Sequence, residues 1–150
     1  MIVDALLSGL HFLLAFSLVA ILAAQGVLIR PGITASGLRL AAQLDRAYGA
    51  SAALLLGIGF GRVFYGAKGA VFYLSNPMFW VKLLLFAAVA VLSIPPTVQL
   101  IRWTRQARLQ ANFAPSTSEV SHLQRWLFSE GLVLVFIPLV AAAMARGLGH

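Results

Sequence analysis

The sequence predicts an all-α integral membrane protein, an antiparallel four-helix bundle, and three observations lead to this prediction. Of the 150 residues, 61% are hydrophobic and 10% are charged, whereas soluble domains carry about 25% charged residues. The apolar residues gather in four stretches, each near the roughly 20 residues that a helix needs to cross a bilayer. Short connections join these stretches, as they do between antiparallel neighbours in a helix bundle. Residues 1–150 are therefore expected to form a single four-span transmembrane domain.

The predicted spans cover residues 5–28, 47–65, 78–101 and 126–145. The first is expected to be a retained span, because Asp4 stands where a secretory signal carries basic residues and the apolar run is too long for such a signal. The sequence has no cysteine, which excludes disulfides, thiolate metal sites and a cysteine nucleophile.

Capping residues mark where the later helices begin. Thr34 or Ser36 is predicted to cap the second helix ahead of its span. Asn76, which a proline follows, is predicted to cap the third helix, since proline is favoured at the first helical position. Ser116 and Glu119 have the spacing of a capping box, which would start the fourth helix about two turns before its span.

Basic residues are unevenly divided between the two ends of the predicted bundle. Basic flanks resist translocation, so the richer end is expected in the cytoplasm and both termini on the periplasmic side. The basic residues are thus placed as they would be at a membrane surface. With a net charge of +7, we expect the protein to interact with the lipid bilayer and not with nucleic acid. The richer end holds Arg30, Arg39, Arg46, Arg102, Arg105, Arg108 and Arg125, and the other end holds Arg62, Lys68, Lys82 and Arg146.

The second span carries a small residue at every fourth position: Gly49, Ala53, Gly57 and Gly61. Small side chains let helix backbones approach closely in a membrane. We expect this ladder to serve helix packing, either because the second helix is central in the bundle or because it forms the seam of a homodimer.

Polar residues of different spans are predicted to meet near the periplasmic end. His11 shares one face of the first helix with Asp4 and Ser8, Arg62 lies near the end of the second span, and Lys82 lies one turn into the third. A charge in lipid needs a partner, a route to the surface or a task. Lys82 either extends to the headgroups or, together with Arg62, faces an anion such as a ligand carboxylate or a haem propionate.

His11 has two interpretations. It is either a core histidine satisfied by Ser8 or a nearby carbonyl group, or a ligand of a haem iron or another metal. Neutral imidazole is a common haem ligand, and the two cations suit propionates. The sequence offers no evident second axial ligand.

A thinner polar set lies toward the cytoplasmic end: Gln25, Tyr48, Ser51, Gln99 and Glu130. Glu130 lies about one turn inside its span. It is expected either to pair with an arginine across the bundle or to take part in proton or ion coupling.

The chain resembles the bacterial family known as domain of unknown function 2214, at "RVFYGAKGAVFYLSNPMFWVKLLLF", with "HFLLAF" before it and "LSIPPTVQLIRW" and "AAAMARG" after it. The resemblance covers nearly the whole chain. It implies a four-span protein of the bacterial inner membrane and little about activity.

More distantly, a histidine in helix one, an arginine ending helix two and W-x-K starting helix three look like the superfamily of HemJ-type protoporphyrinogen oxidases and copper resistance D proteins. That resemblance implies that His11 ligates haem and that Arg62 and Lys82 lie near haem or porphyrin carboxylates. A copper role is weaker, because the methionines and histidines show no clustered spacing.

Three hypotheses for function remain. The preferred one is a redox protein that binds haem b through His11 and, if it is an enzyme, acts as a porphyrinogen- or quinone-linked oxidoreductase. The second is a small proton-coupled transporter or channel subunit that uses Glu130. The third is a non-catalytic scaffold or assembly subunit of a membrane complex.

Overall fold

The protein is an all-α bundle, described by a computed structural model over residues 2–66, 69–110 and 112–147. Its helices are α1 (Ile2–Leu28), α2 (Ala35–Tyr65), α3 (Gly69–Leu74), α4 (Pro77–Leu109) and α5 (Thr117–Ala145). Within these ranges, 4 helices are long and apolar enough to cross a membrane: α1, α2, α4 and α5. The predicted membrane bundle is confirmed.

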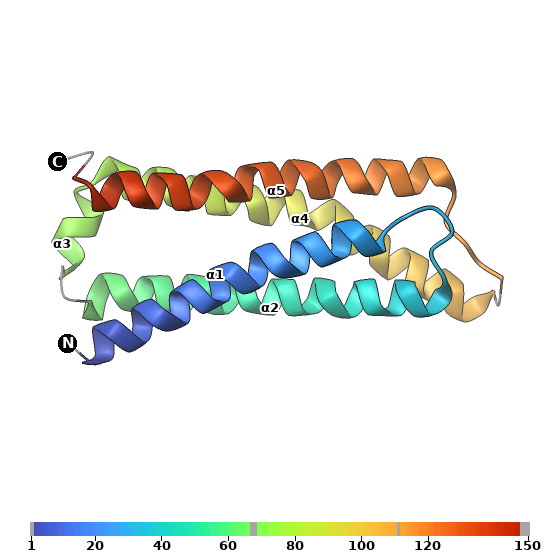
Figure 1. The fold of residues 1–150 in the computed structure, drawn as a ribbon, viewed down its shortest axis with the longest axis horizontal. Helices are drawn as coiled ribbons and strands as arrows, with labels where there is room; N and C mark the ends of the chain where they lie inside the picture. Colours follow the sequence, from blue (N-terminus) through green and yellow to red (C-terminus); the bar gives the residue numbers. More distant parts are fainter. Residues whose placement is uncertain (1, 67–68, 111, 148–150) are drawn as a thin grey trace.

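The four long helices run side by side and alternate in direction (Figure 1). We call one end of the bundle the arginine end, because it carries the α1–α2 and α4–α5 connections and their arginines. We call the other end the α3 end, since α3 joins α2 to α4 there. α1 packs mainly along α2, and α4 mainly along α5, while α2 also contacts α4 and α1 also contacts α5.

The predicted helix starts are confirmed. Thr34 caps α2 by accepting a hydrogen bond from the backbone N–H of Gly37 at 3.2 Å. Asn76 caps α4 through its side-chain oxygen, which accepts from the Met78 N–H at 2.8 Å. The capping box of α5 is complete. The caps start α2 and α5 well ahead of their apolar stretches, and α4 continues beyond its stretch to Leu109, so these helices are longer than the spans they contain.

α3 was not predicted. Gly69 begins it with a φ of 72°, a left-handed conformation that glycine adopts without steric cost. Its Tyr73 ring lies 6.0 Å from the ring of Phe79 on α4. A small apolar cluster of Val63, Phe79 and Met144 gathers beneath it. The short helix therefore packs over the apolar end of the bundle.

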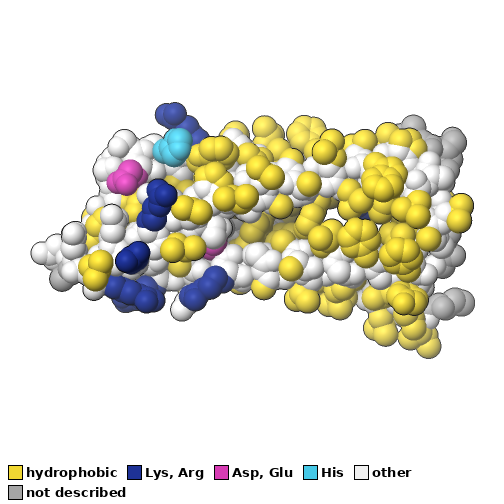
Figure 2. Space-filling model, turned by 180° about the vertical axis from the view of Figure 1, so that it is seen from behind, with side chains coloured by type: hydrophobic (Ala, Val, Ile, Leu, Met, Phe, Trp, Pro, Cys, Tyr) yellow, Lys and Arg dark blue, Asp and Glu magenta, His cyan; other side chains and the backbone are white. Residues whose placement is uncertain are grey.

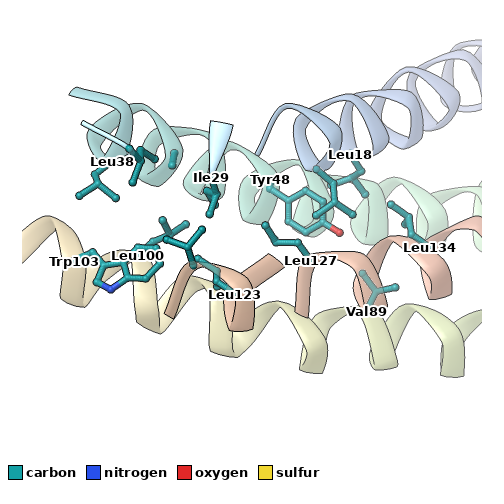
Figure 3. Packing of buried hydrophobic residues seen from close by; sticks show 14 of the residues in the cluster. Leu18, Ile29, Leu38, Tyr48, Val89, Leu100, Trp103, Leu123, Leu127 and Leu134 are labelled. Atoms are coloured by element: carbon teal, nitrogen blue, oxygen red, sulfur yellow. The ribbon is translucent and has the colours of Figure 1, made fainter. Parts of the chain in front are cut away.

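The main core fills the rest of the bundle from the arginine end inward (Figure 3). Trp103, Leu100 and Leu38 are 0% exposed and close that end. Large apolar side chains such as Phe16 and Phe128 are exposed on the flanks. A wide exposed apolar surface is expected of helices that face lipid rather than water.

All seven arginines of the arginine end are exposed, and Figure 2 shows basic side chains gathered at that end while hydrophobic side chains cover most of the remaining face. At the α3 end Arg146 is exposed, whereas Arg62 and Lys82 are partly buried. Lys68 lies outside the described residues.

The small-residue ladder of α2 does not face another helix of the bundle over most of its length. Gly49, Ala53 and Gly57 are exposed, and a Cβ built at Gly49 or Gly57 would meet no described atom within 4 Å. Gly61 is the exception, with Leu7 at 4.0 Å. α2 contacts α1, α3 and α4, but it does so through larger side chains rather than through these three ladder positions. The homodimer seam stays a prediction. The buried residues of α2 are Leu38, Ala41, Tyr48, Leu55 and Val63.

Candidate functional site

His11 lies on the inner side of α1, toward the α3 end, and is partly buried. Its Nδ1 atom is buried and has no hydrogen-bond partner among the described residues. A Cβ built at Gly59 of α2 would lie 3.4 Å from Cε1 of this imidazole and 3.8 Å from Nδ1. The absence of a side chain at Gly59 thus lets the His11 imidazole pack against the backbone of α2. Neither Ser8 nor a carbonyl group of the described residues satisfies this Nδ1, and the alternative of a core histidine satisfied through its other nitrogen stays a prediction.

Arg62 and Lys82 both act electrostatically on His11, so three helices bring the predicted residues together. The Nε atom of Arg62 is buried and, in the described part of the chain, unpartnered. The ammonium of Lys82 lies 5.5 Å from the centroid of the Phe79 ring, within the range of a cation–π interaction. Phe79 is 3% exposed and three residues nearer the α3 end, so this contact holds the Lys82 side chain against the bundle, and the alternative that Lys82 extends to the headgroups stays a prediction.

The two cations also act on each other, because Arg62 is the charged neighbour of Lys82. Placing two positive charges together in a low-dielectric region is unfavourable unless an anion joins them. Asp4 of α1 is a carboxylate at the same end of the bundle. Its carboxylate lies beside Gly66, where a Cβ would be 3.2 Å from Oδ1.

A cavity of about 60 Å³ lies between His11 and Lys82. Apart from these two side chains and Gly59, its lining is apolar and comes from α2, α4 and α5. The apolar lining residues are Leu55, Leu56, Phe60, Phe79, Leu83, Phe86 and Ile137.

A second polar group lies between the α3 end and the arginine end, around Glu130 of α5. Glu130 is 1% exposed, and the charged group that acts on it is Asp45 of α2. The expected arginine partner is not found, because no arginine of the described residues is an ion-pair partner or electrostatic neighbour of this carboxylate. Of the predicted polar set, Tyr48 and Gln25 belong to this group.

Sequence reasoning missed Asp45, because this residue precedes the predicted span 47–65. It is only partly exposed, and its Oδ1 accepts a hydrogen bond from Thr97 of α4 at 3.0 Å. The available signal was its spacing: three residues before Tyr48, it lies on the same face of α2 one turn away. Gln99 lies elsewhere, beside Arg102 and His122 in a groove at the surface.

The family model described as "Predicted membrane protein (DUF2214)" matches residues 3–149. The chain belongs to this family. No curated protein and no solved structure matches it. The similarity to HemJ-type proteins stays a prediction, so any activity of this DUF2214 protein has to be argued from its residues.

The described residues of this DUF2214 protein offer few ligands to a free metal ion. Within the described residues, no group of three or more His, Cys, Asp or Glu side chains could hold a metal ion. His11 would therefore suit a metal that brings most of its own ligands, as the iron of a porphyrin does.

The residues around His11 fit a haem in their chemistry. The imidazole has a nitrogen without a described partner, and cations of two other helices act on the ring. The apolar lining suits the macrocycle. The cavity of about 60 Å³ is far below the roughly 300–1,000 Å³ of ordinary ligand pockets. A porphyrin would thus need more room between the helices than this cavity provides.

Proposed function

We propose that this DUF2214 protein is a redox protein of the bacterial inner membrane that binds haem b near its α3 end. In this proposal His11 supplies an axial ligand, and Arg62 and Lys82 pair with the propionates. One observation carries it: a buried imidazole nitrogen of His11, unpartnered among the described residues, with cations from α2 and α4 beside it. A buried polar atom without a partner costs free energy, which a ligand that bonds to the imidazole would recover.

Each residue has a distinct part in the proposed site. His11 is held against the backbone of α2 at Gly59, which limits how the imidazole can turn. Arg62 offers a planar fork that can bind a carboxylate through two hydrogen bonds, whereas Lys82 offers a compact point charge. The aromatic and aliphatic lining excludes water from the space between them. A bound haem would supply one-electron redox chemistry.

The same proposal includes the orientation of the chain. With the seven exposed arginines in the cytoplasm, the α3 end and both termini lie on the periplasmic side. His11 then lies in the outer half of the bilayer, where a quinone or a porphyrin dissolved in the membrane can approach it.

The absorption spectrum of the detergent-purified protein, oxidised in air and reduced with dithionite, tests the proposal. A pyridine haemochrome assay gives the stoichiometry. We expect a Soret band that corresponds to about one haem per chain and that His11→Ala removes. The matched control is His122→Ala at the arginine end, where His122 accepts a hydrogen bond from Trp126 at 3.0 Å. This control should keep its colour.

Two results would overturn the haem proposal. The first is a protein that stays colourless after expression with added haem and after reconstitution. The second is a Soret band of unchanged intensity and position in His11→Ala, which would show that any haem is held elsewhere.

A further inference from the structure

Glu130 of α5 is a carboxylate enclosed in the bundle. It is 1% exposed, and its Oε1 atom has no hydrogen-bond partner within residues 2–66, 69–110 and 112–147. Two further buried polar groups lie in the same region: the hydroxyl of Tyr48, which is 4% exposed and directed at Glu130, and Nε2 of Gln25, which is 1% exposed and directed at Asp45. Both fall short of full hydrogen-bond geometry in the described part of the chain. Figure 3 shows the Tyr48 hydroxyl pointing into the bundle, between Leu18, Leu127 and Leu134.

Asp45 extends this group toward the arginine end. Thr97 donates a hydrogen bond to its Oδ1 at 3.0 Å, and the side chain of Gln25 lies near it. Asp45 acts electrostatically on both Glu130 and Tyr48. Because Asp45 is only partly buried while Glu130 is fully enclosed, Asp45 forms the mouth of the group and Glu130 its inner end.

The charges around the two carboxyl groups do not balance. α1 contributes the neutral Gln25 and α4 the neutral Thr97, while α2 contributes Asp45 and Tyr48. The cation that acts on the group is Arg46, which is exposed and acts on Asp45. Two carboxylates that act on each other in a low-dielectric interior repel, and an unpaired buried carboxylate is costly. A shared proton removes one of the two charges.

We infer that Asp45 and Glu130 form a carboxyl pair that holds one exchangeable proton inside the bundle. Loading takes a proton from water at the arginine end onto a carboxylate oxygen of Asp45. Transfer runs by way of the Tyr48 hydroxyl, which is directed at Glu130: this hydroxyl gives its proton to Glu130 and takes the proton of Asp45, so that Asp45 is ionised again, and no electrons move. Tyr48 lies close enough to Glu130 to take part in the hydrogen bonding of the protonated form. This inference stands apart from the haem proposal and uses none of its residues.

Infrared spectroscopy of the purified full chain tests the inference, because a protonated carboxyl group has a C=O stretch that a carboxylate lacks. At neutral pH we expect a band that corresponds to one protonated carboxyl per chain and that moves to lower frequency in D2O. Glu130→Gln should remove it. Asp45→Asn should keep a band but slow its shift in D2O at least severalfold, since the mouth of the path is changed.

Glu119→Gln is the matched control, because Glu119 is an exposed carboxylate on the same helix, and its band should equal that of the wild type. The wild-type spectrum alone can overturn the inference: no carboxyl band at neutral pH means no stored proton, whether or not the variants fold. A band that survives Glu130→Gln, or one that does not shift in D2O, overturns it as well. A band that sodium ions abolish would assign the site to a metal cation instead of a proton.

Discussion

Gly59 of α2 presents its backbone to the imidazole of His11: a Cβ at position 59 would lie 3.4 Å from His11 Cε1. This distance leaves room for a methyl group and little more. α1 and α2 therefore approach each other at position 59, where the size of the residue determines the position of the His11 imidazole. Small residues at the exposed ladder positions of α2 have no such neighbour among the described atoms.

Gly59→Ala should raise stability, and Gly59→Leu should lower it. Alanine removes backbone freedom in a helix, worth about 0.5–1 kcal/mol, and its Cβ makes an ordinary contact with His11. Leucine would have to displace the imidazole, and overpacking of this kind costs about 1–3 kcal/mol. Thermal unfolding in one detergent measures both. Gly9→Leu is the control, because a Cβ at Gly9 meets no described atom within 4 Å; equal destabilisation by both leucines would contradict the close approach.

Lys82→Met should stabilise the ligand-free protein while weakening its hold on haem. Lys82 is partly buried beside Arg62, so an apolar side chain of similar length relieves repulsion and desolvation, by about 1 kcal/mol. A hydrogen bond to a charged group contributes about 1.5–3 kcal/mol, so the loss of a propionate partner should weaken haem binding about tenfold or more. Melting temperature and haem titration measure the two effects.

Arg146→Met is the control for this pair of effects, because Arg146 is an exposed cation at the same end. It should change neither quantity. If Lys82→Met lowered the melting temperature, the ammonium would be making favourable interactions in the ligand-free protein, with the Phe79 ring or with an anion. The proposal that its charge is reserved for a ligand would then be contradicted.

Features set by local chemistry were predictable from the sequence. A cap involves residues two or three positions apart, so the sequence identified Asn76 and Ser116 and narrowed the cap of α2 to Thr34 or Ser36, of which the structure shows Thr34. The rise per residue of a helix predicted that His11, Arg62 and Lys82 lie at a similar depth in the membrane. In the structure these three residues lie together near the α3 end, as that depth requires.

Features set by helix rotation were not predictable. The ladder of α2 identifies one face of that helix, but spacing alone does not say whether the face meets another helix or lipid. Asp45 looks like a solvated residue in a charged lead-in until α4 brings Thr97 against it. The same limit applies to Glu130, whose neighbour is a second carboxylate rather than an arginine.

Gln124→Ala should destabilise the bundle by about 1–2 kcal/mol. The Nε2 of Gln124 on α5 donates a hydrogen bond to the carbonyl oxygen of Ile29 at 2.8 Å, just beyond the end of α1. Ile29 is 0% exposed, so truncation leaves its carbonyl buried without this donor. Chemical or thermal unfolding measures the loss. Gln106→Ala, at an exposed position of α4, should fall within about 0.5 kcal/mol of the wild type; a similar loss in both variants would contradict the role of the contact.

The start of α5 should be stabilised by a pH-dependent capping box. Glu119 Oε2 accepts hydrogen bonds from the Ser116 N–H at 2.9 Å and from its hydroxyl at 2.8 Å. These bonds hold the pKa of Glu119 below its ordinary value of 4.5. A folded-state pKa below the unfolded one means that the stabilisation is complete above pH 4.5 and is lost as pH falls through the lower, folded value. Near neutral pH, Ser116→Ala should therefore cost about 1 kcal/mol.

In acid the difference between Ser116→Ala and the wild type should shrink, because protonation of Glu119 removes part of the same box. Amide hydrogen exchange in the first turn of α5, compared at neutral and acidic pH, measures it locally. Ser121→Ala is the control, since the Ser121 hydroxyl donates its hydrogen bond to the Thr117 carbonyl at 2.9 Å within the same helix. The effect of this substitution on exchange should be the same at both pH values. A Ser116→Ala effect that stays constant or grows in acid would show that the Glu119 half of the box contributes nothing.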